Sequence, residues 1–122
     1  MDEPPNQTSP VIDRKVIAEL GAIGAGETVL KRVLGLFEAK VPAAIEDIER
    51  LSAAEDRKAL ADAVHALKSM CSNIGAQRAA AACDDLECLA RSGEDFDVAD
   101  RVARISREAA EAIREVRQLR AA

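Results

Sequence analysis

Apolar residues recur three and four positions apart through most of the chain after residue 10, which is the spacing of amphipathic helices. The pattern predicts a short helix from Val11, followed by helical stretches over about 27–51, 56–74 and 78–91. A last helix is indicated by an unbroken heptad stripe of Val98, Val102, Ile105, Ala109, Ala112, Val116 and Leu119. Short polar turns separate these stretches, so neighbouring helices are expected to run antiparallel.

Local signals place the ends of these helices. Pro42 is expected to kink or divide the 27–51 stretch, because proline lacks a backbone donor. Ser52 and Glu55 have the spacing of a capping box for the following helix. Asn73 and Gly75 suit a left-handed stop, after which the chain reverses tightly.

The expected fold class is therefore all-α, an up-down-up-down antiparallel four-helix bundle with an additional short N-terminal helix. Residues 1–10 are polar and proline-rich and are predicted to be disordered, whereas 11–122 form one helical domain. The N-terminal helix either presents aliphatic surface near His65 or only closes one end of the core. A coiled-coil dimer is the rival explanation of the heptad stripe. We favour a monomeric bundle because three earlier amphipathic segments also need to bury apolar faces.

Composition narrows the class of protein. The 122 residues are 48% hydrophobic but only 2% aromatic, which favours packed helices. A formal charge of −5 argues against nucleic acid as a partner. The sequence has no apolar run of membrane-spanning length and no signal peptide, so a cytoplasmic protein without a membrane partner is expected. The three cysteines have no metal-binding spacing, so no metal site is expected. Cys71 and Cys83 lie on apolar arcs and are expected to be small buried residues.

The only histidine, His65, lies on the predicted 56–74 helix. At about 100° per residue it falls roughly 160° from the middle of the apolar arc. The small side chains of Ala61, Ser69 and Ser72 flank it and should leave steric access to the imidazole, while Lys68 reaches the same patch of surface. His65 is then either an ordinary solvated residue or a nucleophile. A neutral imidazole can attack a phosphoryl group near pH 7, with Lys68 balancing the phosphoryl charge.

A second set of candidates follows from the reversal near Ala76. The antiparallel partner of His65 must lie about as far beyond that turn as His65 lies before it, which indicates Leu86 or Glu87; of the two, Glu87 is on the polar flank of its helix. Glu87 could accept a hydrogen bond from Nδ1–H and so fix the tautomer that leaves Nε2 with a free lone pair. Arg91 faces the same way and could pair with Glu87 or meet an incoming anion. The alternative for both residues is an ordinary exposed ion pair.

The run from His65 to Ala76 resembles the motif of histidine-containing phosphotransfer (HPt) domains, His-x-Leu-Lys-Gly-x-(Ser/Ala) followed by Gly-Ala. Ser69 departs from the usual glycine; the positions that match are His65, Leu67, Lys68, Cys71, Gly75 and Ala76. The resemblance covers most of the chain, but its specific part is this run. It implies a protein that relays a phosphoryl group between phospho-aspartate receiver domains in a two-component phosphorelay, through phosphohistidine at His65. The implied partners are response regulators and hybrid histidine kinases, with Mg²⁺ supplied by the receiver and no cofactor bound by this chain.

Such a chain is a covalent phosphotransfer intermediate rather than an independent kinase, because the sequence shows no glycine-rich phosphate loop and hence no ATP site. The main alternative is a helical-bundle protein-interaction module with no phosphoryl chemistry. An enzyme using His65 as a general base would need a pocket with further titratable groups.

Overall fold

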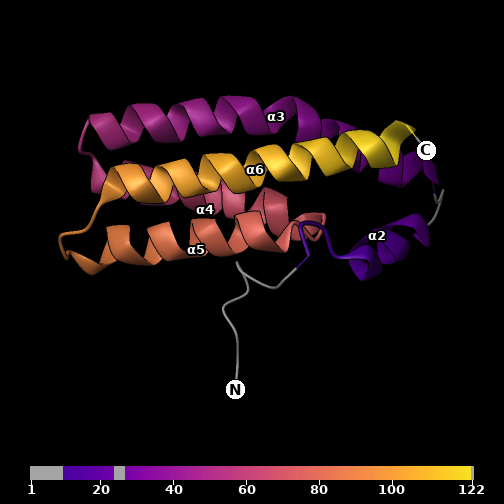
Figure 1. Ribbon diagram of the computed structural model, residues 1–122, viewed down its shortest axis with the longest axis horizontal. Coiled ribbons are helices and arrows are strands. Elements are labelled where there is room, and N and C mark those ends of the chain that lie inside the picture. Colours follow the sequence, from indigo (N-terminus) through magenta and orange to yellow (C-terminus); the bar gives the residue numbers. More distant parts are fainter. Residues whose placement is uncertain (1–9, 24–26, 122) are drawn as a thin grey trace, which may run out of the picture.

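The computed structural model describes residues 10–23 and 27–121, and all regular structure in these ranges is helical. The elements are α2 (Arg14–Gly21), α3 (Glu27–Ala53), α4 (Arg57–Asn73), α5 (Gln77–Ser92) and α6 (Val98–Ala121). Helices α3 to α6 lie along the long axis and alternate in direction (Figure 1). The all-α prediction is confirmed, and the alternation agrees with up-down-up-down order. The predicted disordered segment lies, apart from Pro10, outside the described residues.

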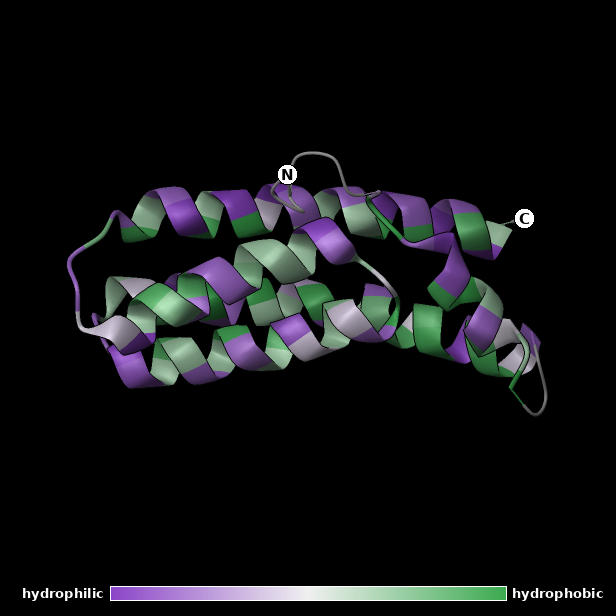
Figure 2. Ribbon diagram, turned by 90° about the horizontal axis from the view of Figure 1, so that it is seen from below, coloured by the Kyte–Doolittle hydropathy of each residue, from purple (hydrophilic) through white to green (hydrophobic). Residues whose placement is uncertain are grey.

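The four long helices form a closed ring around one core. Each packs on its chain neighbours, and α3 also packs on α6. Hydrophobic and hydrophilic residues alternate around each helix (Figure 2), so each has one apolar face to bury. The heptad stripe of α6 is used in this way; its buried members are Val102, Ile105, Ala109, Ala112 and Val116. No described helix is both long and apolar enough to cross a membrane.

The α4–α5 pair makes the most extensive helix contact of the bundle. The buried face of α5 is built mainly from small side chains: Ala79, Ala82, Cys83, Leu86 and Ala90. Small residues let two helix backbones approach closely. The extensive contact between α4 and α5 therefore fixes the relative positions of side chains on these two helices.

Helix α4 begins differently from the prediction. Its cap is Asp56, whose side chain accepts a hydrogen bond from the Ala59 N–H at 3.1 Å. Ser52 is still inside α3, where its hydroxyl donates to the Glu49 carbonyl. Glu55 has a φ of 59°, so the chain turns at that residue. The predicted capping box of Ser52 and Glu55 is wrong, because α3 runs to Ala53 and leaves the capping role to the next extended residue.

The predicted stop at Gly75 is confirmed. Gly75 has a φ of 76°, a left-handed conformation in which glycine has no Cβ penalty. The Ala76 N–H donates to the Cys71 carbonyl at 2.8 Å and the Gly75 N–H to the Ser72 carbonyl at 3.1 Å. These two bonds form a Schellman motif that ends α4 and turns the chain directly into α5.

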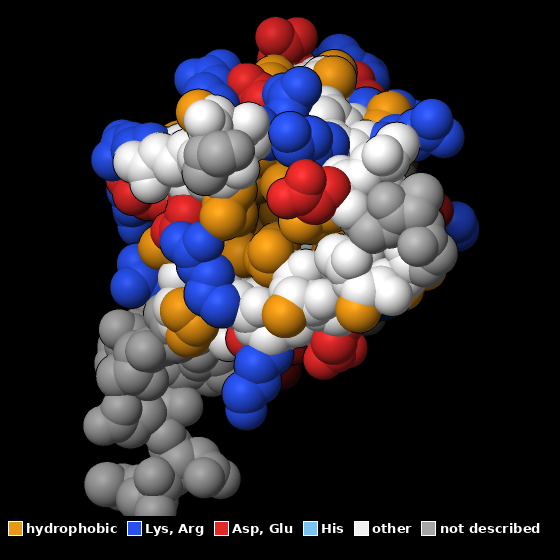
Figure 3. All heavy atoms as spheres, turned by 90° about the vertical axis from the view of Figure 1, so that its right-hand side faces the viewer, with side chains coloured by type: hydrophobic (Ala, Val, Ile, Leu, Met, Phe, Trp, Pro, Cys, Tyr) orange, Lys and Arg blue, Asp and Glu red, His pale blue; other side chains and the backbone are white. Residues whose placement is uncertain are grey.

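Helix α2 closes the end of the bundle beside this turn. With 17 and 16 residues, α4 and α5 are shorter than α3 and α6, with 27 and 24, and α2 lies beyond their turn (Figure 1). The Asp13 N–H donates to the Gly75 carbonyl at 2.8 Å, and Gln77 Nε2 donates to the Asp13 carboxylate at 2.9 Å. Arg14 pairs with Glu115 of α6. Figure 3 shows hydrophobic side chains at the bottom of a hollow in this end, surrounded by charged ones.

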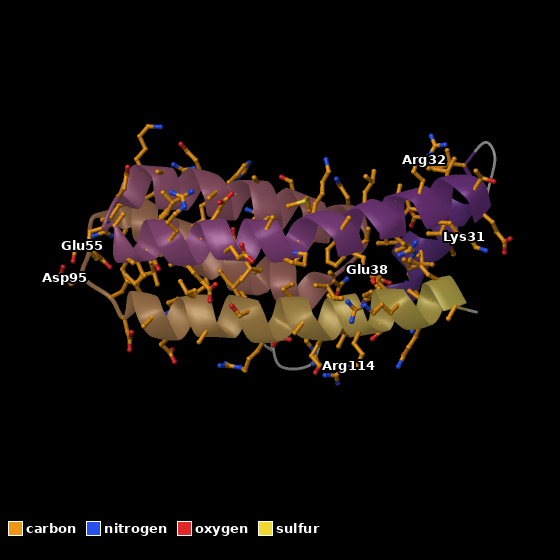
Figure 4. All side chains as sticks on the ribbon, turned by 90° about the horizontal axis from the view of Figure 1, so that it is seen from above. Lys31, Arg32, Glu38, Glu55, Asp95 and Arg114 are labelled. Carbon is orange, nitrogen blue, oxygen red and sulfur yellow. The ribbon has the colours of Figure 1, made fainter. Side chains whose placement is uncertain are left out.

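Charged contacts fasten α3 to α6. Glu38 points from α3 toward α6 (Figure 4) and binds Arg117 at 2.7 Å, as well as Arg120. The hydrogen bonds from Arg117 and then Arg120 hold the pKa of Glu38 below its ordinary value. The helix also continues unbroken through Pro42, whose side chain is exposed, so the predicted division of this helix does not occur.

Candidate functional site

His65 lies on the polar face of α4 with 57% of its side chain exposed. Its Nδ1 is 3.0 Å from Oε2 and 3.2 Å from Oε1 of Glu87 on α5. An ionised carboxylate can only accept hydrogen bonds, so Nδ1 carries the proton and donates it. The lone pair is then on Nε2, to which the described residues give no hydrogen bond. The structure thus brings His65 and Glu87 together with the nucleophilic nitrogen left free.

Glu87 is the centre of the cluster. Only 12% of its side chain is exposed, and its carboxylate accepts a hydrogen bond from Arg91 Nε at 3.2 Å as well as the one from the imidazole. Burial alone would raise the pKa of Glu87, but the hydrogen bonds from His65 and Arg91 outweigh it and hold the pKa below its ordinary value. Glu87 is therefore ionised at neutral pH and serves as a fixed acceptor.

Two cations flank the imidazole, each held by a further carboxylate. Lys68 Nζ is 2.8 Å from Asp84 and 3.6 Å from Glu87, and the hydrogen bond to Asp84 is the main cause that raises its pKa. Arg91 binds Asp62 at 3.1 Å as well as Glu87. Its pKa is raised chiefly by Asp62. The candidates His65, Lys68, Glu87 and Arg91 thus share one patch.

Asp62 and Asp84 were missed by reasoning from the sequence. Asp84 lies as far after Ala76 as Lys68 lies before it, which is the register that pairs Glu87 with His65. The same counting would have found it. Asp62 lies one helical turn before His65 and binds Lys58 as well as Arg91; these two contacts lower its pKa. Counting from Ala76 places Asp62 opposite Ala90, one position from Arg91, so the same reasoning would have brought this contact within one residue.

The small residues around His65 differ in their placement. Ser69 and Ser72 are exposed on the same helix. Ser69 replaces the usual glycine of the family motif. Its hydroxyl donates to the His65 carbonyl at 3.2 Å, so the added polar group is bonded to the backbone of its own helix. Ala61 is fully buried, because its side of α4 meets the alanine-rich α5. It therefore forms no part of the exposed patch.

The remaining features of the site are apolar. Cys71 and Cys83 are both buried, as predicted, and the pKa of Cys83 is raised by its hydrogen bond to Cys71 and by burial. Among the described residues, no group of three or more His, Cys, Asp or Glu side chains is placed to hold a metal ion.

A groove between α3 and α4 is lined by Val33, Leu36, Phe37, Lys40, Met70, Asn73 and Ile74. Leu36 in this groove is 50% exposed.

An exposed imidazole with an oriented lone pair and two nearby cations is suited to attack on an anionic phosphorus centre. Comparison with known proteins agrees with this chemistry. A family model described as Hpt domain matches residues 32–122. Among solved structures, the histidine-containing phosphotransfer protein B (HptB) from Pseudomonas aeruginosa PAO1 is similar at a TM-score of 0.84 and 27% sequence identity. The match covers 93% of this chain and 96% of that chain. No curated protein sequence matches the chain.

Proposed function

The chain belongs to the Hpt domain family, and from that premise we propose that His65 is the residue that carries the phosphoryl group in a phosphorelay. The observation that supports this assignment best is the bond between His65 Nδ1 and Glu87, which leaves Nε2 of an exposed ring as a free nucleophile. His65 is also the only histidine in the sequence. No other side chain of the chain can therefore form phosphohistidine.

In the proposed step, the Nε2 lone pair attacks the phosphorus of a receiver phospho-aspartate. The N–P bond forms as the P–O bond breaks, and the aspartate leaves as a carboxylate with the bonding electrons. The imidazole keeps its Nδ1 proton, and the positive charge that develops on the ring faces the ionised Glu87 at 3.0 Å. Lys68 offsets charge on the phosphoryl oxygens, and the reverse reaction delivers the group to another receiver. Positioning and charge balance supply the rate in such transfers.

The proposed partners are the receiver domains of response regulators and of hybrid histidine kinases in the cytoplasm. By family resemblance the receiver would also bring the Mg²⁺ that balances charge during transfer. The apolar groove between α3 and α4 supports a protein partner here. It opens along α4, the helix that carries His65, and it combines apolar residues such as the exposed Leu36 with the polar Lys40 and Asn73, a mixture that suits contact with another protein.

Transfer assays test this proposal. Receiver domains from the same organism would be charged with radiolabelled acetyl phosphate and mixed with wild-type protein or the His65→Gln variant. We expect the wild type to take up acid-labile, alkali-stable phosphate from at least one receiver. The variant should take up none while keeping its helical circular dichroism spectrum.

A helical interaction module without phosphoryl chemistry gives a different result. Its wild type would bind receivers without taking up phosphate, and His65→Gln would leave binding and signalling unchanged. That outcome would refute the proposed role of His65.

A further inference from the structure

Lys68 is not a free cation in the structure. Its ammonium group donates to Asp84 at 2.8 Å and lies 3.6 Å from Glu87, so both of its partners are carboxylates of α5. Asp84 is the more exposed partner, with 55% of its side chain accessible against 12% for Glu87. Water can therefore replace the contact of Asp84 with Lys68 more easily than that of Glu87.

The patch as a whole is balanced in charge before any phosphoryl group arrives. Its three cations are Lys58, Lys68 and Arg91, and its three carboxylates are Asp62, Asp84 and Glu87. Each cation lies within ion-pair distance of at least one of these carboxylates. A phosphoryl group on Nε2 places roughly two negative charges on its oxygens, of which the positive ring offsets only one while Nδ1 keeps its proton. For Lys68 to balance that charge, it must share or leave a carboxylate that already binds it.

Asp84 is the carboxylate that can be given up. Glu87 also binds His65 and Arg91, so its separation from the cluster would release the imidazole from its oriented state. Among the described residues, Lys68 is the only ion-pair partner of the Asp84 carboxylate. Asp62 contacts Lys58 and Arg91 but not Lys68.

We propose that Asp84 competes with the phosphoryl group for Lys68 and thereby sets how strongly His65 retains a phosphoryl group. This inference rests on the proposed function of His65. With Asp84 present, the gain from pairing Lys68 with the phosphoryl oxygens is reduced by the loss of the Asp84 contact. Phosphohistidine is then less stable than Lys68 alone would make it, which favours passing the group on. Asp84 is a positioning residue, because it acts through Lys68 and not on the phosphoryl group directly.

The test uses the full chain and a small phosphodonor, potassium phosphoramidate, so that no particular partner has to be assumed. The rate of His65 phosphorylation by phosphoramidate and the rate of its reversal by ammonium together give an equilibrium ratio. This ratio would be measured for wild type, Asp84→Asn, Lys68→Ala and the double variant. Asp85→Asn is the matched control, since it removes the same charge from the adjacent position of α5 but contacts Arg101 and Arg104 on α6.

We expect Asp84→Asn to shift the ratio toward phosphohistidine by about two- to fivefold, the range that an exposed ion pair supports. Asp85→Asn should shift it by clearly less. In the Lys68→Ala background, Asp84→Asn should have no effect, because the residue for which Asp84 competes is gone. A thermal melt of each variant separates these effects from unfolding.

Three results would overturn the inference: an unchanged or lowered ratio in Asp84→Asn, the same rise in Asp85→Asn, or a rise that persists without Lys68. The last two would show that only net charge matters. If wild-type protein takes no phosphoryl group at His65, the proposed function fails and the inference fails with it. Normal phosphorylation with an unresponsive Asp84→Asn variant overturns the inference alone.

Discussion

The role of Glu87 can be tested by replacing its carboxylate in two steps. Glu87→Gln keeps an oxygen that can accept the Nδ1 hydrogen bond but removes the charge, and Glu87→Ala removes the acceptor. A hydrogen bond to an ionised group contributes about 1.5–3 kcal/mol. Since 57% of the His65 side chain is exposed, water competes for Nδ1 and the lower end of this range applies. Loss of about 1.5 kcal/mol corresponds to roughly a tenfold change in the balance between the two tautomers.

The rate follows the fraction of molecules with the proton on Nδ1, so we expect Glu87→Ala to lower the rate of phosphorylation by phosphoramidate by at most roughly tenfold, and Glu87→Gln to lie between Glu87→Ala and wild type. Long-range ¹H–¹⁵N correlation spectra would report the tautomer directly. Wild type should show the proton on Nδ1, and Glu87→Ala should show a larger share on Nε2. Arg91→Ala is the control: Arg91 also binds Glu87, but removing Arg91 keeps the carboxylate that accepts the Nδ1 hydrogen bond, so the tautomer should be unchanged. Unchanged spectra and rates in both Glu87 variants would refute the orienting role.

The pH dependence of stability follows from the same carboxylate. The pKa of Glu87 is lower in the folded protein than its ordinary value of 4.5. Its contribution to stability is therefore fully present above pH 4.5 and is lost as the pH falls through the lower folded pKa. Thermal melts should show wild type losing stability relative to Glu87→Gln only below pH 4.5. An equal loss in both proteins would show that Glu87 makes no pH-dependent contribution.

Three further variants and a thiol reagent test other features of the structure. Gly75→Ala should cost roughly 2–4 kcal/mol of unfolding free energy, because its φ is left-handed and a Cβ there would lie 2.9 Å from Val16. Gly93 shares the left-handed φ, but a Cβ there would meet no atom within 4 Å, so Gly93→Ala should cost only about 1 kcal/mol. Urea titrations of both variants measure these two costs. Lys68→Ala should slow phosphoryl uptake without lowering the melting temperature by more than a few degrees; an unchanged rate would refute charge balancing by Lys68. A thiol reagent should label exposed Cys88 rapidly in the native protein and the two buried cysteines only after denaturation, which mass spectrometry resolves.

Some of the site was predictable because helix register is a matter of counting. Once Gly75 and Ala76 were identified as the reversal, equal distances along the two helices paired His65 with Glu87, and the structure shows that contact at 3.0 Å. The apolar rhythm likewise indicated which face of each helix is buried. These properties depend on the positions of residues along one helix or one helix pair.

Other features depend on how helices meet and could not be obtained in this way. Ala61 is at the edge of the polar face by its wheel position, but close approach of α5 buries it. Pro42 costs about 3 kcal/mol within a helix, yet the buried residues on both sides of it, such as Phe37 and Ile48, hold the helix together. The Ser52–Glu55 spacing fits a capping box by sequence, but the length of α3 decides which residue is the cap.

In the proposed mechanism, Nε2 of His65 carries the phosphoryl group while Nδ1 stays bound to Glu87. The most direct test is ³¹P and ¹⁵N NMR of the phosphorylated full-length protein, which distinguishes phosphorylation at the two ring nitrogens. We expect one phosphorus signal coupled to Nε2 of His65, absent from His65→Gln. A phosphate on Nδ1 or on any other residue would refute this assignment.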